Sequence, residues 1–199
     1  MGRSLLFLLA LASLANCSSS DPTPVSDRQL VLAIPAGRRA FPRGDTVTIS
    51  AALVGAGGST SVTSGVTWRS LTTAPATVSQ RGLVTFGADG NAVIEGTLSG
   101  STAKVTIPIR GRLHAGAVQA RETWLAADGP HLVSREIEVG AADTAVLTIE
   151  SGAQVLLRPR ALIEFGQFAP GRLVIAPGAG RVEMAADSIG AGSWVGLYF

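Results

Sequence analysis

After residue 27, apolar and polar residues alternate with a period of two through most of the chain. Runs in which every second residue is Val, Leu, Ile or Phe are short, and turns rich in Gly, Pro and Asn separate them. This alternation is typical of β-strands that bury one face. Because no stretch past residue 20 keeps a long apolar period of about 3.6 residues, the pattern predicts an all-β fold.

Between residues 28 and 110 the alternation predicts a sandwich of two sheets. The expected strands lie at residues 30–34, 46–53, 66–70, 77–79, 83–86, 92–96 and 103–107. Many short alternating strands in so few residues are typical of two sheets packed face to face. Trp68 is expected to fill the core between the sheets. The sequence Ala88-Asp89-Gly90-Asn91 predicts a tight hairpin turn, since Gly and Asn tolerate positive φ.

Two matching phrases, Leu-x-Ile-x-x-Gly, organise the second half of the chain. They stand at residues 147–152 and 173–178, so their corresponding residues lie 26 positions apart. Each phrase describes a short strand with two inward apolar residues, followed by a turn closed by Gly. A strand-and-turn unit that recurs at a period of roughly 20 to 50 residues is typical of a solenoid, in which each coil covers the apolar face of the last.

The other strands of this half are also short and regularly spaced. We expect strands at residues 131–133, 136–139, 145–149, 153–157, 161–165, 172–175 and 181–184. Residues 130–199 are therefore predicted to form about two to three coils, and residues 111–129 a connector that caps the first coil. So few coils leave an open strand edge, which must be capped, pair edge to edge with another chain or promote aggregation.

The first 16 residues have the pattern of a secretory signal peptide. Arg3 precedes an apolar run from Leu5 to Leu11, which is too short for a transmembrane helix, and small residues follow it. The segment Leu14-Ala15-Asn16-Cys17 resembles the lipobox of bacterial lipoproteins, and this resemblance implies that Cys17 is lipidated and becomes the first residue of the mature chain. Residues 17–27 then hold the lipidated cysteine and a polar, proline-bearing tether.

Composition excludes several classes of function. The 16 basic and 14 acidic residues are spread without runs and leave a formal net charge of +2, so no electrostatic footprint for nucleic acid is present. Cys17 is the one cysteine, which excludes internal disulfides and a metal site built from cysteines.

Four ordered motifs between residues 28 and 110 resemble the bacterial immunoglobulin-like domain of group 2. They are Gly44-Asp45-Thr46-Val47 leading into Ser50-Ala51, then Val66-Thr67-Trp68-Arg69-Ser70, then Ala76-Thr77-Val78 with Gly82-Leu83-Val84-Thr85, and Gly90 before Ala92-Val93-Ile94. The resemblance implies a spacer or adhesion module of exported proteins, without catalytic residues.

The second half also resembles a known architecture. The span from Trp124 to Val155, with the phrase at 147–152, looks like the opening of a right-handed parallel β-helix from bacterial surface proteins. The ending Gly192-Ser193-Trp194-Val195-Gly196-Leu197 resembles the strand that such proteins place after their second or third coil. This resemblance implies a short β-helix or β-solenoid fragment after the sandwich.

The sequence predicts no catalytic, cofactor-binding or metal-binding residue. Enzymes on β-helices group two or three carboxylates along one face of stacked strands, and the candidates here are Glu150, Glu164, Glu183 and Asp187. Glu164 and Glu183 alternate with apolar neighbours, so solvent-facing strand positions explain both. The two histidines, His114 and His131, form no cluster with the ligand spacing of a metal site.

The sequence thus predicts an exported protein that a lipid anchors to the cell envelope, at the outer membrane or cell surface. The expected function is a non-catalytic presentation or adhesion module that binds an extracellular glycan or protein. Two alternatives stay open: the N-terminal part of a polysaccharide-acting enzyme of β-helix type, with its catalytic coils outside this chain, and a truncated product without independent function. No cofactor and no nucleic-acid partner are expected.

Overall fold

The computed structural model describes residues 28–188 and 196–199, and in these residues the chain is all-β. Strands of several sheets are joined by turns, and one short 3-10 turn, η1 (Ala126–Asp128), precedes the second set of sheets. Among the described residues no helix has the length and apolar character needed to cross a membrane. The prediction of an all-β fold is confirmed.

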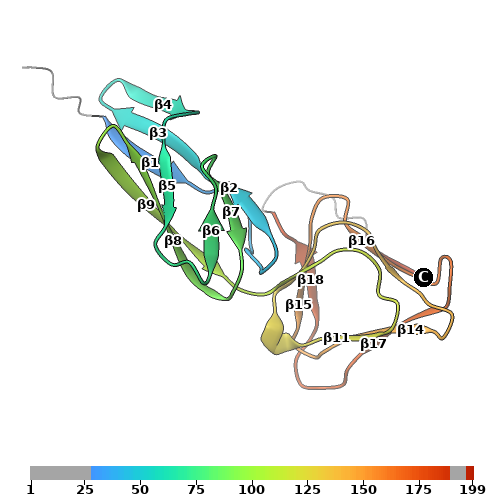
Figure 1. The fold of residues 1–199 in the computed structure, drawn as a ribbon. Helices are drawn as coiled ribbons and strands as arrows, with labels where there is room; N and C mark the ends of the chain where they lie inside the picture. Colours follow the sequence, from blue (N-terminus) through green and yellow to red (C-terminus); the bar gives the residue numbers. More distant parts are fainter. Residues whose placement is uncertain (1–27, 189–195) are drawn as a thin grey trace, which may run out of the picture.

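The first half consists of three antiparallel sheets around one core (Figure 1). Their strand orders are β1 (Gln29–Ala33), β3 (Ser50–Gly55) and β4 (Gly58–Val62); β2 (Thr46–Thr48), β7 (Leu83–Phe86) and β6 (Ala76–Val78); and β5 (Thr67–Ser70), β8 (Gly90–Leu98) and β9 (Ser101–Ile109). Trp68 is buried in this core, as predicted, and packs among side chains of the other strands.

Several details of the first half differ from the prediction, which expected two sheets where the structure has three. Residues 46–53 form two strands in different sheets, because the chain changes partner at Ile49, whose N–H donates to the carbonyl of Gly82 over 2.9 Å. Residues 88–91 do not form a hairpin turn, since β7 and β8 belong to different sheets. The hairpin lies instead between β8 and β9, where Ser99 and Gly100 both have positive φ.

The second half consists of three parallel sheets that the chain visits in turn. The strand orders are β10 (Arg112–His114), β12 (His131–Val133), β15 (Gln154–Leu157) and β18 (Glu183–Ala186); β11 (Arg121–Trp124), β14 (Ala145–Ile149) and β17 (Gly171–Ile175); and β13 (Ile137–Val139), β16 (Leu162–Phe165) and β19 (Gly196–Tyr198). Each new strand lies beside the strand one circuit earlier. The three sheets enclose one apolar core (Figure 1).

The repeated phrase is the clearest sign of this arrangement in the sequence. Strand β14 pairs with β17 so that Leu147 stands opposite Leu173 and Ile149 opposite Ile175. The two phrases are therefore neighbouring strands of one sheet. Residues 111–129, expected as a connector, contribute more than a link, because β10 and β11 are the first strands of two parallel sheets and Val118 forms a bridge with Val139.

Burial decreases toward the last strand of each parallel sheet. Leu147, Val155 and Ile163 are fully buried, whereas their partners Leu173, Met184 and Leu197 are only partly buried. These partners lie on β17, β18 and β19, beyond which the described residues supply no further strand. The apolar interior is therefore incompletely covered at this end.

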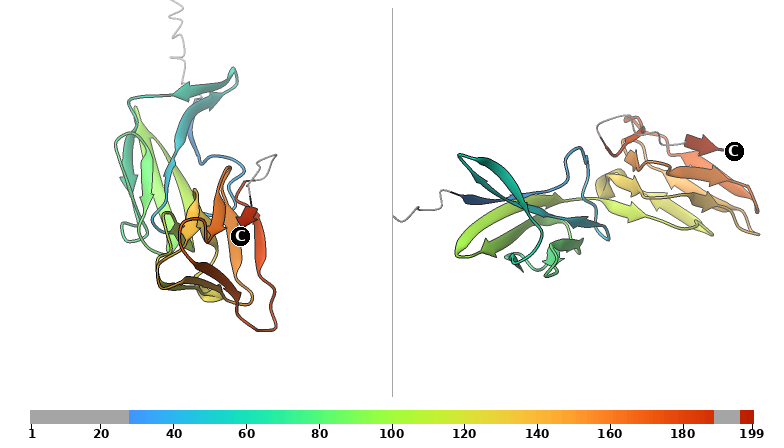
Figure 2. Two further views of the ribbon diagram at one scale, coloured as in Figure 1. Left: turned by 90° about the vertical axis from the view of Figure 1, so that its right-hand side faces the viewer. Right: turned by 90° about the horizontal axis from the view of Figure 1, so that it is seen from above.

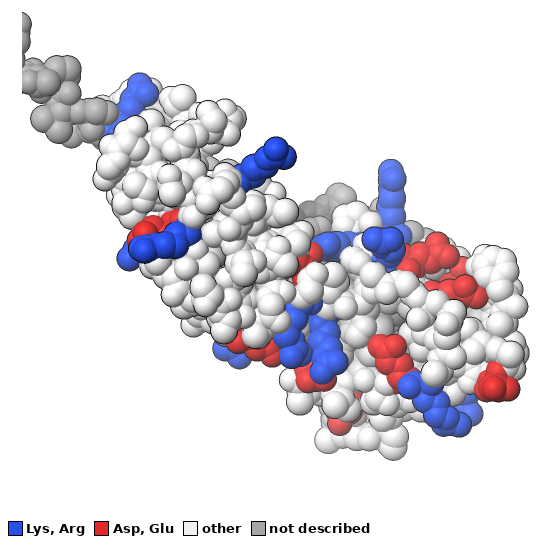
Figure 3. Space-filling model, in the orientation of Figure 1, with Lys and Arg blue, Asp and Glu red and all other residues white. Residues whose placement is uncertain are grey.

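The two halves are arranged end to end in an elongated molecule. Figure 2 shows the antiparallel sheets at one end and the parallel sheets at the other, with the start of β1 far from the parallel sheets. Figure 3 shows that acidic and basic side chains are intermixed on the face in view, in keeping with the small net charge of +2.

Candidate functional site at the junction of the two halves

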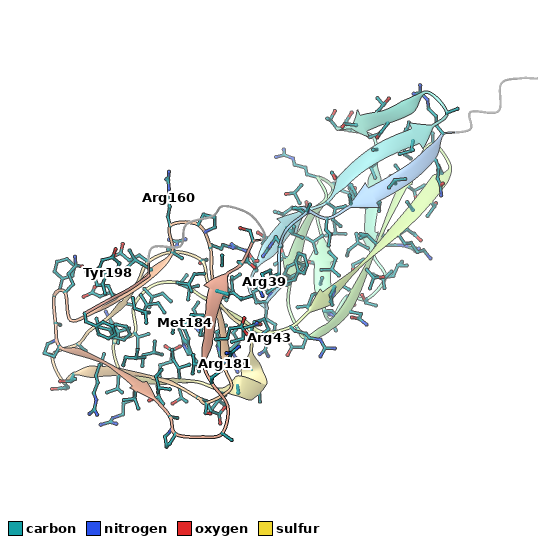
Figure 4. All side chains as sticks on the ribbon, turned by 180° about the vertical axis from the view of Figure 1, so that it is seen from behind. Arg39, Arg43, Arg160, Arg181, Met184 and Tyr198 are labelled. Atoms are coloured by element: carbon teal, nitrogen blue, oxygen red, sulfur yellow. The ribbon has the colours of Figure 1, made fainter. Side chains whose placement is uncertain are left out.

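A short segment of the first half crosses the outside of a parallel sheet of the second half. This segment, residues 38–43, is called the junction strap below. At one end the N–H of Arg39 donates to the carbonyl of Asp187 over 2.8 Å, just beyond β18. At the other end the N–H of Arg43 donates to Gly111, and Leu113 of β10 donates back to Arg43. Figure 4 shows Arg39 and Arg43 at the junction.

Under the strap, the outer face of the four-stranded parallel sheet is apolar. Leu113, Leu132, Leu156 and Ala185 stand side by side on successive strands, and Ala40 of the strap packs against them. Both faces of β12 and of the end of β15 are therefore buried. This explains why residues 131–133 and 155–157 are continuously apolar or buried instead of alternating.

Four charged side chains lie beside the strap and are called the junction ion cluster below. Arg38 and Asp45 come from the first half, and Arg158 and Asp187 from the second. One oxygen of Asp45 accepts hydrogen bonds from both guanidinium groups. Asp187 Oδ2 lies 3.9 Å from Arg38 Nε and 3.7 Å from Arg158 Nε. Asp45 and Asp187 are only 4% and 3% exposed, so their charges need these partners.

An open surface depression with a volume of about 440 Å³, called the junction cavity below, lies beside the junction ion cluster. Its lining combines charged, hydroxyl and apolar side chains from both halves: Pro35, Arg38, Thr46, Val47, Thr48, Arg158, Pro159, Asp187 and Ser188. Within the described residues, Asp187 Oδ1 and Arg38 Nε are buried without a hydrogen-bond partner. A cavity between two units, with a few convergent polar groups, is a common setting for a small-molecule site.

Two histidines lie on β10 and β12, the first two strands of the four-stranded parallel sheet. His131 is 1% exposed and places Nε2 2.8 Å from the carbonyl of Leu125, so this nitrogen must donate. His131 Nδ1 is then an acceptor and lies 2.9 Å from His114 Nε2. These partners assign one proton to each neutral ring, on Nε2 in both cases.

Trp124 and Glu122 complete this group. The Trp124 ring stacks on His131 with centroids 5.3 Å apart, and its Nε1 donates to Glu122 Oε1 over 2.7 Å. Burial, with the neighbouring His131 and Arg112, lowers the pKa of His114 to about 4. Burial also lowers the pKa of His131, although the Leu125 carbonyl and Asp128 act in the opposite direction. Both rings are therefore neutral at pH 7.

The four carboxylates considered as catalytic candidates in the sequence do not come together in the structure. Glu150 accepts a hydrogen bond from the N–H of Ala126 over 2.6 Å, and Glu183 is exposed on β18. Glu164 lies on β16 in register between Glu138 and Tyr198. Among the described residues no group of three or more His, Cys, Asp or Glu could hold a metal ion. Cys17, the predicted lipidation site, lies outside the described residues.

Of these four carboxylates, Asp187 alone belongs to the junction ion cluster. The sequence did not predict its partners in that cluster. Arg38 and Asp45 lie more than 100 positions before Arg158, and no motif in the sequence links them to Arg158 or Asp187. Their meeting depends on how the strap crosses the sheet, which no short-range pattern encodes. Comparison of the sequence with models of protein families finds no match, and comparison with curated proteins finds no significant similarity.

Proposed function

We propose that the chain is an exported surface lipoprotein that acts as a non-catalytic presentation or adhesion module for a glycan or protein. In this proposal the antiparallel half is an immunoglobulin-like sandwich of the bacterial group 2 type. The parallel half is the beginning of a right-handed parallel β-helix, and Cys17 carries the lipid.

The observation that carries this proposal is the end-to-end mounting of the two halves. The first described strand, β1, begins at the end farthest from the parallel sheets (Figure 2). An anchor joined to this end would direct the parallel sheets away from the membrane. The strap, its apolar contacts and the junction ion cluster then hold the two halves in one orientation, which suits presentation of a surface at a distance.

The rival hypothesis is a polysaccharide-acting enzyme whose catalytic coils lie outside this chain. The observation that favours it is the open edge formed by β17, β18 and β19, on which further parallel strands could stack. The same edge could pair with a second molecule. Depolymerisation of bacterial or host polysaccharides by a natural gene product that carries further coils beyond Phe199 would support the enzyme and contradict the non-catalytic module.

Anchoring is tested by changing Cys17 to Ser. We expect the unchanged chain, expressed in a bacterial host, to partition into the detergent phase of an envelope extract, because acyl chains bind membranes strongly. The Cys17→Ser variant should lose the acyl-dependent detergent partitioning and the incorporation of labelled fatty acid. Equal labelling of both proteins would contradict lipidation at this residue.

Adhesion is tested separately, with purified protein on glycan arrays and on immobilised extracellular-matrix and cell-surface proteins. Saturable binding to a glycan or a protein supports the module. Absence of binding to every glycan and every protein tested would contradict it.

A further inference from the structure

We infer that the junction cavity binds a neutral sugar residue through two neighbouring hydroxyl groups. The inference rests on the proposed function, in which the chain binds a glycan or protein, and it assigns one binding position and one ligand class. The cavity is the space of about 440 Å³ beside the junction ion cluster.

The first argument is the state of Asp187. This carboxylate is 3% exposed, lines the cavity and makes no hydrogen bond through Oδ1 within the described part of the chain. A buried acceptor without a donor costs about 1–3 kcal/mol, and more when it is charged. The other oxygen, Oδ2, lies 3.7 Å from Arg158 Nε and 3.9 Å from Arg38 Nε, and both distances are too long for hydrogen bonds. Because Oδ1 has almost no accessible surface, the carboxylate must turn toward the cavity before a ligand hydroxyl can supply the missing donor.

The second argument is that donors lie beside this acceptor. Arg158 and Arg38 line the same cavity, and the guanidinium group can only donate. Arg38 Nε is itself buried, and among the described residues its N–H has no acceptor within hydrogen-bond distance. A sugar hydroxyl both donates and accepts, so two neighbouring hydroxyls can bridge Asp187 and an arginine together. The hydroxyl groups of Thr46, Thr48 and Ser188 offer further partners around the rim.

The third argument concerns charge. The two arginines and two aspartates of the junction ion cluster sum to zero, and Asp45 is already bound by both guanidinium groups. An acidic ligand would meet the negative charge of Asp187, and a cationic ligand would meet two guanidinium groups. A neutral polyhydroxyl compound avoids both repulsions. Pro35 and Pro159 give the cavity apolar surfaces on which the C–H faces of a sugar ring can lie.

The experiment uses the full chain and four free sugars: glucose, galactose, mannose and N-acetylglucosamine. Binding is measured by saturation-transfer NMR and by titration, with glucuronic acid and inorganic phosphate as anionic probes. Two variants remove the site in different ways. Asp187→Asn keeps the side-chain volume but removes the charged acceptor, and Thr48→Trp fills the cavity from the exposed face of β2.

A matched control carries the same substitution away from the cavity. Thr77 is exposed on β6, in the same three-stranded sheet as Thr48, and does not line the cavity. Thr77→Trp should therefore bind as the unchanged protein does. Thermal unfolding of all variants shows whether each is folded. Since Thr48 is exposed, Thr48→Trp tests the site even if Asp187→Asn destabilises the junction.

We expect at least one neutral sugar to bind. Asp187→Asn should weaken that binding about tenfold or more, as loss of a hydrogen bond to a charged group does. Thr48→Trp should weaken it at least as much, because the indole ring occupies the cavity. Three results would overturn the inference: no neutral sugar binds, only an anionic probe binds, or Thr48→Trp binds sugar as well as Thr77→Trp. Array binding to a glycan or protein that survives Thr48→Trp would refute this site while leaving the proposed adhesion function intact.

Discussion

The two stacked histidines predict that acid destabilises the protein in a defined pH range. His114 and His131 are both neutral in the folded chain. His131 Nδ1 accepts a hydrogen bond from His114 Nε2, and burial lowers the pKa of both rings. In the unfolded chain both rings take up a proton near pH 6.5. The perturbation is therefore a change of pH from 7.5 to about 4.

The magnitude follows from the pKa of His114, which falls from 6.5 to about 4 on folding. At about 1.4 kcal/mol per pKa unit, this difference corresponds to about 3 kcal/mol of unfolding free energy. A depressed folded-state pKa of a base means that the unfolded chain binds the proton first. The stabilisation is thus fully present above pH 6.5 and is lost as the pH falls toward 4. His131 changes stability in the same direction.

The charged groups around the pair modify this effect. Arg112 opposes protonation of both rings, whereas Glu122 and Asp128 favour protonation of His131. Glu122 Oε1 also lies 3.4 Å from His114 Nδ1, where a first added proton would be received. A second proton would leave two donors facing each other across the 2.9 Å contact. We therefore expect the pair to resist the second protonation most strongly.

The assay is urea unfolding at a series of pH values, for the unchanged chain and for His114→Gln. Glutamine can still donate to His131 but does not titrate. The two proteins share their carboxylates, so these groups contribute equally to both curves of unfolding free energy against pH. The unchanged chain should lose more stability than the variant between pH 6.5 and 4, by up to about 3 kcal/mol. Parallel curves for the two proteins over this range would refute the assignment of a neutral, buried pair.

Three further substitutions test the junction and the turns of the parallel sheets by thermal and urea unfolding. Asp45→Ala leaves two guanidinium groups without their shared partner and should cost about 3–5 kcal/mol, whereas Asp89→Ala removes an exposed ion pair and should cost less than about 1 kcal/mol. Equal losses would contradict this account of the cluster. Gly171→Ala should cost about 1–3 kcal/mol or more, because a Cβ there would lie 1.7 Å from a backbone carbonyl of β13. Gly57→Ala is its control and should change stability by less than about 0.5 kcal/mol, since nothing lies within 4 Å. Leu156→Ala should cost about 2–5 kcal/mol by leaving a cavity beneath the strap, and a loss below about 1 kcal/mol would show that the strap is loosely packed.

Local patterns were sufficient to predict most strands. Alternation located β5, β7 and β14 to within about two residues, because each buries one face and leaves the other exposed or half-buried. Strand β4 was missed because its sequence, Gly-Ser-Thr-Ser-Val, is polar and its side chains are mostly exposed. Its pairing with β3 depends on the hairpin and not on burial.

The coil period was visible in the sequence at one pair of strands, whose residues also match. The phrases at 147–152 and 173–178 lie 26 residues apart and are neighbours in one sheet. In another sheet His131 pairs with Val155, 24 positions later, and Val155 pairs with Met184, 29 positions later. Turns of unequal length destroy a fixed repeat in the sequence while leaving the strands in register.

The junction explains why the residues of the candidate site were harder to predict than the strands. Leu132 and Leu156 point outward from the parallel sheets, and burial of each side chain contributes about 1.5–3 kcal/mol only while the strap covers it. The strap in turn brings Arg38 and Asp45 to Arg158 and Asp187. Each half thus completes the packing of the other. The cavity, bordered by residues of both, belongs to the whole molecule, and neither half would form it alone.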